Sequence, residues 1–364
     1  MLDVEQVTLI DTFFREDVAR LTGGLHSLSE RVDTEAVARR DEAYEQLLSL
    51  LSDSREACRL LEQRLAGDEP ALREVQQRFQ EAIEPWFSQS WMMDRARTKP
   101  QGYAGDYAML TSIYEAEPKS KGIGGLLDLF FLATELGRAV PARKDAVREF
   151  LAGEFEERSG DVRVLNVACG PCREFEDGVA CPPQSNVSVT FVDYDEDSLA
   201  FAEQQLTQNP GPFEYSFVRY NALRMQAPKR FIEEHGLFDV IYSVGLCDYL
   251  SDRQLIAMFK GWKSMLRPGG VLYVAFKDRH RYDKTDYQWL TDWFFLEREE
   301  ADCRRLFVEA GYSDADLGMS RDASGIILNF AARDSARRRI DSPHSVGPAT
   351  AAVEDRTPNP EASR

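Results

Sequence analysis

Six short apolar runs separated by amphipathic stretches recur between residues 161 and 333, and they constrain the fold more than any other feature of the sequence. The runs are VRVLNVA (162–168), VSVTFVD (187–193), YSFVRY (215–220), FDVIYSV (238–244), GVLYVAF (270–276) and IILNFAA (326–332). Each run is rich in β-branched and aromatic residues and has the length of a buried strand. Strands that alternate with helices form a mostly parallel sheet covered by helices. The sequence therefore predicts an α/β fold for this region.

The first 85 residues have a different pattern and are predicted to form a helical bundle. Within residues 43–67, apolar side chains recur mostly at spacings of three, four or seven, with charged residues between them. This stripe comprises Tyr44, Leu47, Leu48, Leu51, Cys58, Leu61 and Leu65. Gly67 is expected to end one helix, and Pro70 to begin the next.

Three further segments complete the domain division. Residues 86–125 mix aromatic, basic, glycine and proline residues without a clear period, which is typical of an irregular segment that carries binding residues. We expect a lid there. Residues 126–333 are predicted to form the main domain, whose leading helix is interrupted near Pro141. Residues 334–364 are polar and punctuated by proline, and are predicted to be disordered.

The composition of the chain limits the classes of binding partner that we expect. The formal charge of −18 opposes loose binding to nucleic acid or to an anionic membrane. The start of the chain lacks a basic and apolar secretory signal, and no apolar stretch approaches the length of a membrane span. Six cysteines in a chain of 364 residues do not indicate a disulfide framework, so a reducing cytoplasm is expected. The four histidines are scattered, and no metal site is expected.

The stretch VLNVACGPCREF (164–175) allows two interpretations. Cys169-Gly-Pro-Cys172 matches the active-site tetrapeptide of thioredoxins, whose first cysteine is exposed at a helix start. Alanine stands at position 168, where a thioredoxin has tryptophan, and the surrounding order of elements is not that of a thioredoxin. The alternative is a small-residue turn after a strand, where the backbone approaches a ligand and a helix start offers N–H groups.

Residues further along the chain favour the second interpretation. A strand end about 25 residues later should supply an acid for ribose hydroxyls, and Asp193 follows Gly170 by 23 residues at the end of an apolar run. Asn221 and Ala222 follow the third run, where the edge of an adenine would lie. A nucleotide-like cofactor is therefore predicted at this edge of the sheet.

This ordered set of motifs resembles the class I S-adenosylmethionine-dependent methyltransferases over residues 160–333. The resemblance implies a Rossmann-like sheet of seven strands, the last antiparallel, here preceded by an N-terminal helical cap. It implies S-adenosyl-L-methionine as the cofactor, and as cofactor-binding residues Asn166, Ala168, Gly170, Asp193, Tyr194, Asn221, Ala222 and Ser243. Many such enzymes have an acid where Asn166 stands, so contact with the cofactor ammonium is expected from elsewhere.

A narrower resemblance covers residues 80–310. The stretches KPQGYAGDYAMLTSIYE, NVACGPCREF, YSVGLCDYLSDRQ and YQWLTDWFFLER are similar to a bacterial group that makes the methyl ester of 3-hydroxypalmitic acid. The group is diverse, so it implies cofactor and architecture more firmly than substrate. A small-molecule substrate is expected, with a carboxylate or a hydroxy fatty acid as the acceptor.

Candidate catalytic residues come from three segments. Tyr103 and Asp106 lie in the expected lid, where the carboxylate would hold an ammonium and a tyrosine would face the sulfonium. Asp248 and Tyr249 follow the fourth run, where the crevice of a doubly wound sheet opens. The cationic stretch at residues 277–281 would attract a carboxylate, although such a run is more often a solvated face.

Three functions remain open at this point. The first is methyl transfer to a small molecule, for which a carboxylate acceptor needs no base. The second is a cyclase, in which the cofactor's own amine attacks the carbon next to sulfur, forming azetidine-2-carboxylate and releasing methylthioadenosine. The third is a cofactor-binding protein without turnover. Scaffold alone does not separate these, and the sequence does not indicate the oligomeric state.

Overall fold

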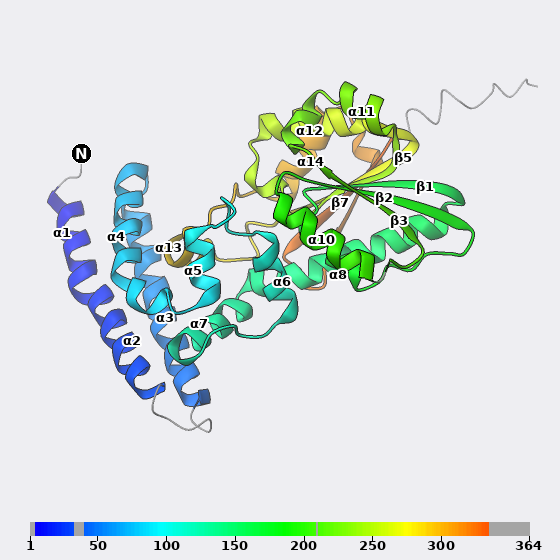
Figure 1. Cartoon of the computed structure of the whole chain (residues 1–364). Coiled ribbons are helices and arrows are strands. Elements are labelled where there is room, and N and C mark those ends of the chain that lie inside the picture. The colour runs from blue at the N-terminus through cyan, green and yellow to red at the C-terminus, as the bar shows by residue number, and fades with distance from the viewer. Residues whose placement is uncertain (1–3, 33–39, 209, 335–364) are drawn as a thin grey trace, which may run out of the picture.

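The computed structural model describes residues 4–32, 40–208 and 210–334. A layer of N-terminal helices lies at one end of the molecule and a strongly twisted sheet at the other (Figure 1). The tail that was predicted to be disordered lies outside the described residues from position 335 onward. Among the described helices, none has the length and apolar character needed to cross a bilayer.

The seven-stranded sheet has the order β3-β2-β1-β4-β5-β7-β6. All neighbouring pairs from β3 to β5 are parallel, whereas β7 is antiparallel to both β5 and β6. The strands are β1 (Gly160–Val167), β2 (Ser185–Asp193), β3 (Phe213–Arg219), β4 (Phe238–Ser243), β5 (Leu266–Lys277), β6 (Leu317–Arg321) and β7 (Ile327–Arg333). The predicted Rossmann-like sheet with an antiparallel last strand is confirmed.

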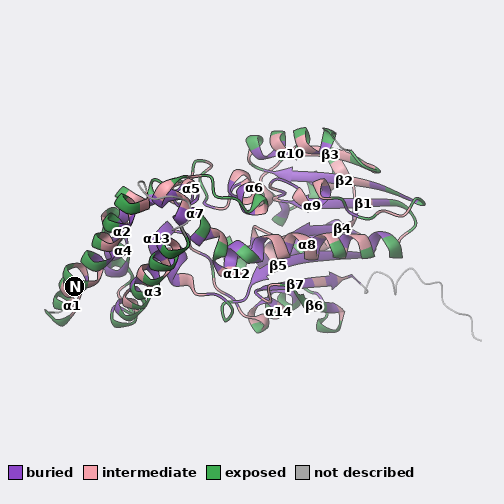
Figure 2. Ribbon diagram, turned by 90° about the horizontal axis from the view of Figure 1, so that it is seen from below, coloured by how far each residue is buried: buried purple, intermediate pink, exposed green. Residues whose placement is uncertain are grey.

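Two groups of helices cover the faces of the sheet (Figures 1 and 2). One group consists of α8 (Glu135–Glu157), α9 (Arg173–Glu176) and α10 (Glu196–Gln208). The other consists of α11 (Lys229–His235), α12 (Asp252–Met265) and α14 (Glu300–Glu309). Figure 2 shows the strands buried between them, which explains why the runs in the sequence are apolar on both faces.

The N-terminal layer is helical, as predicted. Its helices are α1 (Val4–Phe13), a π-helical turn (Phe14–Val18), α2 (Ala19–Val32), α3 (Arg40–Arg64) and α4 (Glu69–Phe87). Gly67 adopts a left-handed φ of 98° between α3 and α4, and the Asp68 carboxylate accepts a hydrogen bond from the N–H of Ala71. The break expected between Gly67 and Pro70 is therefore present, with Asp68 as the helix cap.

The segment expected to be irregular is mostly helical. It contains α5 (Trp91–Thr98), α6 (Tyr107–Glu115) and the start of α7 (Gly122–Ala133). Side chains that cap these short helices were not recognised in the sequence: Ser90 accepts from the N–H of Met93, and Asp106 accepts from that of Met109. The irregular part is confined to the short connections, including the loop at residues 99–106.

The expected interruption at Pro141 is also corrected. Pro141 lies inside α8, and the chain breaks seven residues earlier, at Thr134, between α7 and α8. The hydroxyl of Thr134 accepts a hydrogen bond from the N–H of Gly137 at 3.2 Å, which starts α8 there.

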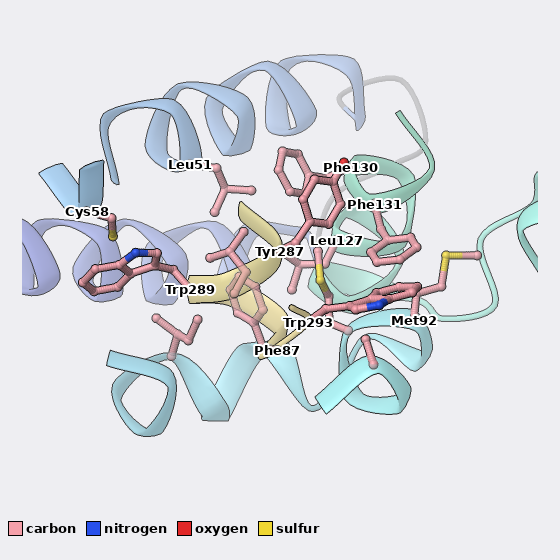
Figure 3. Close-up of a cluster of buried hydrophobic side chains, with 14 of the residues drawn as sticks. Leu51, Cys58, Phe87, Met92, Leu127, Phe130, Phe131, Tyr287, Trp289 and Trp293 are labelled. Carbon is pink, nitrogen blue, oxygen red and sulfur yellow. The ribbon is translucent and has the colours of Figure 1, made fainter. Parts of the chain in front are cut away.

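A short helix from the far end of the chain completes the N-terminal layer. Helix α13 (Lys284–Thr291), which follows β5, packs among the N-terminal helices (Figure 3). The ring of Trp289 meets those of Phe13 and Phe79 edge to face, at centroid distances of 5.8 and 5.5 Å. The Arg55 side chain donates to both oxygens of Asp286, with Nε at 2.9 Å from each. The core of the N-terminal layer thus includes residues of α13 and reaches Ala275 of β5 and Ile327 of β7.

Candidate functional site

A cavity of about 630 Å³ opens at the carboxyl ends of β1 to β4, the position at which doubly wound sheets bind ligands. Its lining comes from the turns after these four strands and from residues 101–110 of the lid. Six of the eight predicted cofactor residues line it: Ala168, Gly170, Asp193, Tyr194, Asn221 and Ala222. The structure therefore brings together residues from three separate stretches of sequence.

The turn after β1 has an unusual backbone. Ala168, Gly170 and Cys172 all have positive φ, between 54° and 57°, which only glycine adopts without strain. A Cβ at Gly170 would meet only the side chain of Leu110, at 3.5 Å, so the residue faces open space in the cavity. The turn therefore presents its backbone to the open space of the cavity.

Asp193 connects this turn to the end of β2. Its two carboxylate oxygens accept hydrogen bonds from the N–H groups of Gly170 and Asp195, each at 3.1 Å. Burial raises the pKa of Asp193, and these two backbone bonds oppose the rise. The N–H of Tyr194 is a third backbone donor to this carboxylate, whose two oxygens still retain a lone pair for a ligand hydroxyl.

Asp195 offers a second acceptor at the same place. Its Oδ2 is buried and has no hydrogen-bond partner among the described residues, and the residue lines the cavity. A buried polar atom without a partner is costly, which indicates that a ligand group or water satisfies it. With Glu196 and Asp197 beside it, this wall of the cavity is acidic and suits a cationic ligand.

The two thiols of the CGPC stretch do not form a redox centre. Cys169 and Cys172 are both buried, and burial raises the pKa of each thiol. A catalytic dithiol needs an exposed cysteine with a lowered pKa. The turn thus belongs to the ligand cavity, and the cysteines pack beneath it.

Two predicted cofactor residues lie beneath the cavity and do not line it. Asn166 is buried and donates to Glu174 at 3.1 Å, while the hydroxyl of Ser243 donates to the carbonyl of Val167 at 2.8 Å. Both side chains hold the strands and the turn, which corrects the expectation of direct contact. Glu174, which also accepts a hydrogen bond from Tyr242 at 2.6 Å, places a carboxyl group beside Asn166.

The two lid candidates differ in placement. Tyr103 lines the cavity and is 36% exposed, and burial of its hydroxyl raises its pKa. Asp106 is fully buried, caps α6, and forms an ion pair with Arg95, whose Nη2 lies 2.8 Å from Oδ2. Its carboxylate is thus occupied by the protein, which corrects the expectation that it holds an ammonium.

The carboxylate of Asp248 is likewise paired with a side chain of the protein. Its Oδ2 lies 2.6 Å from Nζ of Lys277, both residues are buried, and Asp248 does not line the cavity. This corrects the expectation of a direct contact with the acceptor. The cationic stretch at residues 277–281 is split, because Lys277 is buried whereas Arg279 pairs with Glu299 near the surface.

A second, smaller cavity of about 40 Å³ adjoins the first. The two cavities share Gly105, Leu110, Gly245 and Tyr249 in their linings. The inner cavity has aromatic and aliphatic walls, and two cationic side chains, Arg143 and Lys277, reach it; its other walls are Ile113, Phe131, Leu136, Gly137, Val140, Tyr287, Trp293 and Phe295. The two cavities are therefore contiguous, and the inner one presents cationic groups.

Several lining residues were missed in the sequence. They are Gln101, Leu110, Arg143, Arg219, Tyr220, Leu223 and Leu246. One of them left a recognisable signal: Ala139, Arg143, Val147 and Leu151 follow one another at intervals of four, so a charged residue occupies the apolar stripe of α8. The others give no pattern, because they meet only in the folded chain.

The comparisons with known proteins agree with this geometry. Residues 164–270 match a family described as a methyltransferase domain. This region runs from β1 into β5 and contains the turn at Gly170, Asp193 and Asn221. S-adenosylmethionine is the cofactor of this domain, which confirms the cofactor expected from the sequence. No curated protein matches the chain.

One solved structure shares the fold over much of the chain, and two others are more distantly similar. A possible exported protein from Bordetella parapertussis is 21% identical, with a TM-score of 0.52 over 63% of this chain and 79% of that one. Magnesium protoporphyrin IX methyltransferase from Synechocystis PCC 6803, with bound S-adenosylmethionine, is 13% identical, with a TM-score of 0.39 over 54% and 83%. An S-adenosylmethionine-dependent methyltransferase from Leishmania major is 18% identical, with a TM-score of 0.40 over 63% and 82%.

Proposed function

We propose that this chain is an S-adenosylmethionine-dependent methyltransferase that acts on a small molecule by in-line methyl transfer. The observation that carries the proposal is the pair of joined cavities. The larger one collects six residues expected at the cofactor, and the smaller one adjoins it with walls contributed by the lid, α8 and α13. Two reactants can therefore lie side by side.

The residues present fit the cofactor. Asp193 and the unsatisfied Oδ2 of Asp195 would accept hydrogen bonds from hydroxyl groups, Gly170 would lie against the methionine part, and Asn221 would lie beside adenine. The acidic wall suits a positively charged molecule. When bound, S-adenosylmethionine supplies a methyl group on a cationic sulfur.

The chain itself contributes alignment and exclusion of water. Tyr103, Tyr107 and Tyr249 line the larger cavity, and aromatic faces stabilise a nearby cation by about 0.5–2 kcal/mol. The lid is anchored on both sides of the cavity: Lys99 Nζ donates to the carbonyl of Asp292 at 2.8 Å, and Gln101 donates to Asp197 at 3.0 Å. Holding two reactants in line is worth effective molarities of roughly 10⁵–10⁸ M.

The acceptor class is part of the proposal. A carboxylate is nucleophilic at neutral pH and needs no general base, which suits an inner cavity that presents Arg143 and Lys277. A water needs roughly 10–15 Å³ of such volume, so about 40 Å³ accommodates a carboxyl group and few further atoms. We therefore expect compact carboxylic acids, among them short 3-hydroxy acids, before the long acyl chain of 3-hydroxypalmitate.

The test is incubation of the purified protein with S-adenosylmethionine, first alone and then with a panel of carboxylic acids or a cell extract, followed by mass spectrometry. S-adenosylhomocysteine that forms only with an acceptor supports the proposal. Asp193→Asn should weaken S-adenosylhomocysteine binding about 10- to 100-fold, the range for hydrogen bonds to a charged group. Asp161→Asn, at the exposed opposite end of β1, is the matched control.

Two other results would contradict methyl transfer. Methylthioadenosine and an azetidine acid, formed from S-adenosylmethionine alone above the spontaneous background, would establish the cyclase instead. Tight binding of S-adenosylmethionine with no product from any acid or extract would favour a cofactor-binding protein.

A further inference from the structure

We infer that Arg143 is the carboxylate-binding residue of this site and that it acts where the two cavities meet. The inference rests on the proposed function and deepens it, because it assigns the anionic contact to one side chain. Two carboxylates are candidates: that of the cofactor's methionine part and that of the acceptor.

Arg143 is buried without a counter-ion of its own. It lies on α8, is 6% exposed and lines the inner cavity. In the part of the chain that the structure describes, its Nε has no hydrogen-bond partner, and no carboxylate forms an ion pair with it. Tyr114, a neutral phenol, is the group that interacts with it most directly.

The guanidinium group reaches the junction of the cavities. A Cβ added at Gly245 would lie 3.9 Å from Nη2 of Arg143. Gly245 follows β4 and lines both cavities. An anionic group in either cavity near this glycine would therefore lie within reach of the guanidinium group.

The neighbouring charges do not neutralise Arg143. Lys277, the other cation of the inner cavity, is paired with Asp248 at 2.6 Å. Glu174, an acid that interacts electrostatically with Arg143, accepts hydrogen bonds from Asn166 and Tyr242 and forms no ion pair with Arg143 among the described residues. The inner cavity therefore retains the positive charge of Arg143.

A buried charge without a partner is strongly destabilising, whereas a guanidinium paired with a carboxylate gains two parallel, charge-assisted hydrogen bonds. Such an arginine is expected where the counter-ion arrives with a ligand. A sulfonium or ammonium group would be repelled at this position, which leaves the carboxylates as the groups of either reactant that suit it.

The first arm of the test compares two ligands by calorimetry. S-adenosylhomocysteine has the methionine-derived carboxylate, and 5′-methylthioadenosine lacks it. If Arg143 binds the cofactor's carboxylate, Arg143→Met should weaken S-adenosylhomocysteine binding about 10- to 100-fold and leave methylthioadenosine binding unchanged. Arg148→Met, on the exposed side of α8 beside Asp145, is the matched control and should change neither.

The second arm tests the acceptor's carboxylate. Acetate, butyrate and benzoate are titrated into protein saturated with S-adenosylhomocysteine, and binding is followed by NMR. If Arg143 binds the acceptor, the wild type should bind at least one of these acids, and Arg143→Met should abolish that binding without changing S-adenosylhomocysteine affinity. Arg143→Lys retains the charge, should bind with intermediate affinity, and replaces the methionine variant if that variant does not fold.

The results distinguish a failure of the inference about Arg143 from a failure of the proposed function. If the wild type binds S-adenosylhomocysteine and Arg143→Met changes neither that affinity nor the binding of the acids, the inference is overturned and the proposed function stands. If the wild type binds neither S-adenosylhomocysteine nor methylthioadenosine, the proposed function fails, and this inference fails with it.

Discussion

At the scale of single residues, the turn after β1 shows how burial decides chemistry. Cys169 and Cys172 have the spacing of a redox dithiol, yet both are packed against the core under the sheet edge. Desolvation disfavours their thiolates and raises the pKa of each. The stretch whose cysteine spacing suggests a redox dithiol therefore forms the floor of the cavity.

The burial of the cysteines predicts how fast each thiol reacts in the native protein. Of the six cysteines, Cys181 is partly exposed and the others are buried. With an aromatic disulfide reagent at pH 8, we expect one fast-reacting thiol, lost in Cys181→Ser, and six in urea. Because the pKa values of the buried thiols are raised, their slow reaction should accelerate as pH increases above 8. A fast reaction of Cys169 in the native protein would revive the redox interpretation.

At the scale of elements, the lid depends on one buried carboxylate. Asp106 caps α6 and pairs with Arg95 of α5, so a single side chain fixes the angle between the helices that flank the loop at residues 99–106. Tyr103 and Gln101, which line the cavity, are carried by this loop. The Asp106 carboxylate, which was expected to contact a ligand, instead positions the neighbouring loop residues that line the cavity.

Asp106→Asn should therefore destabilise the protein. Removing one partner of a buried ion pair costs about 3–5 kcal/mol, and the lower end of this range is expected because Arg95 is 17% exposed. Urea unfolding followed by circular dichroism measures the loss. Glu117→Gln, an exposed acid in the same segment, is the control. An unchanged unfolding free energy combined with lost ligand binding would instead assign Asp106 to ligand contact.

At the scale of the whole molecule, the core of the N-terminal helices extends toward the α/β region through α13, while the two faces of the sheet have cores of their own. Helix α13 inserts Trp289 between side chains of the N-terminal helices, while Tyr287 of the same helix lines the inner cavity and accepts a hydrogen bond from the N–H of Leu136 at 3.0 Å. Packing in the helical layer is thus coupled to the shape of the site.

Trp289→Ala tests this coupling. Replacing a buried tryptophan by alanine should lower the unfolding free energy by roughly 3–5 kcal/mol, and loosening α13 should weaken binding of short acids to the inner cavity. The measurements are urea unfolding and NMR titration. Gln288→Ala, whose side chain is partly exposed on the same helix, serves as the control. Loss of stability with unchanged acid binding would show that the helical layer does not shape the site.

The sequence by itself determined the sheet, the turn at Gly170, the acid at Asp193 and the N-terminal helices. Each of these depends on local chemistry: apolar periodicity, small residues at a strand end, and turn or capping residues close in the chain. β6 has a weakly apolar sequence and was implied only by the resemblance. Six of the eight residues predicted at the cofactor line the larger cavity, because each lies at or just after the end of a strand.

Only the tertiary structure decided the placement and partners of Asp106, Asp248, Asn166 and Ser243, and the position of Arg143 at the inner cavity. A carboxylate in an irregular stretch has the same sequence signal whether it faces a ligand or an arginine. The side chain that pairs with the carboxylate decides what the carboxylate contacts. For Asp248 that partner is Lys277, which lies 29 residues away in the sequence. The inner cavity is built by the lid, α8, β5 and the segment around α13, which are distant in sequence and adjacent only after folding. Local patterns predict elements, whereas the pairing of buried charges depends on how those elements pack.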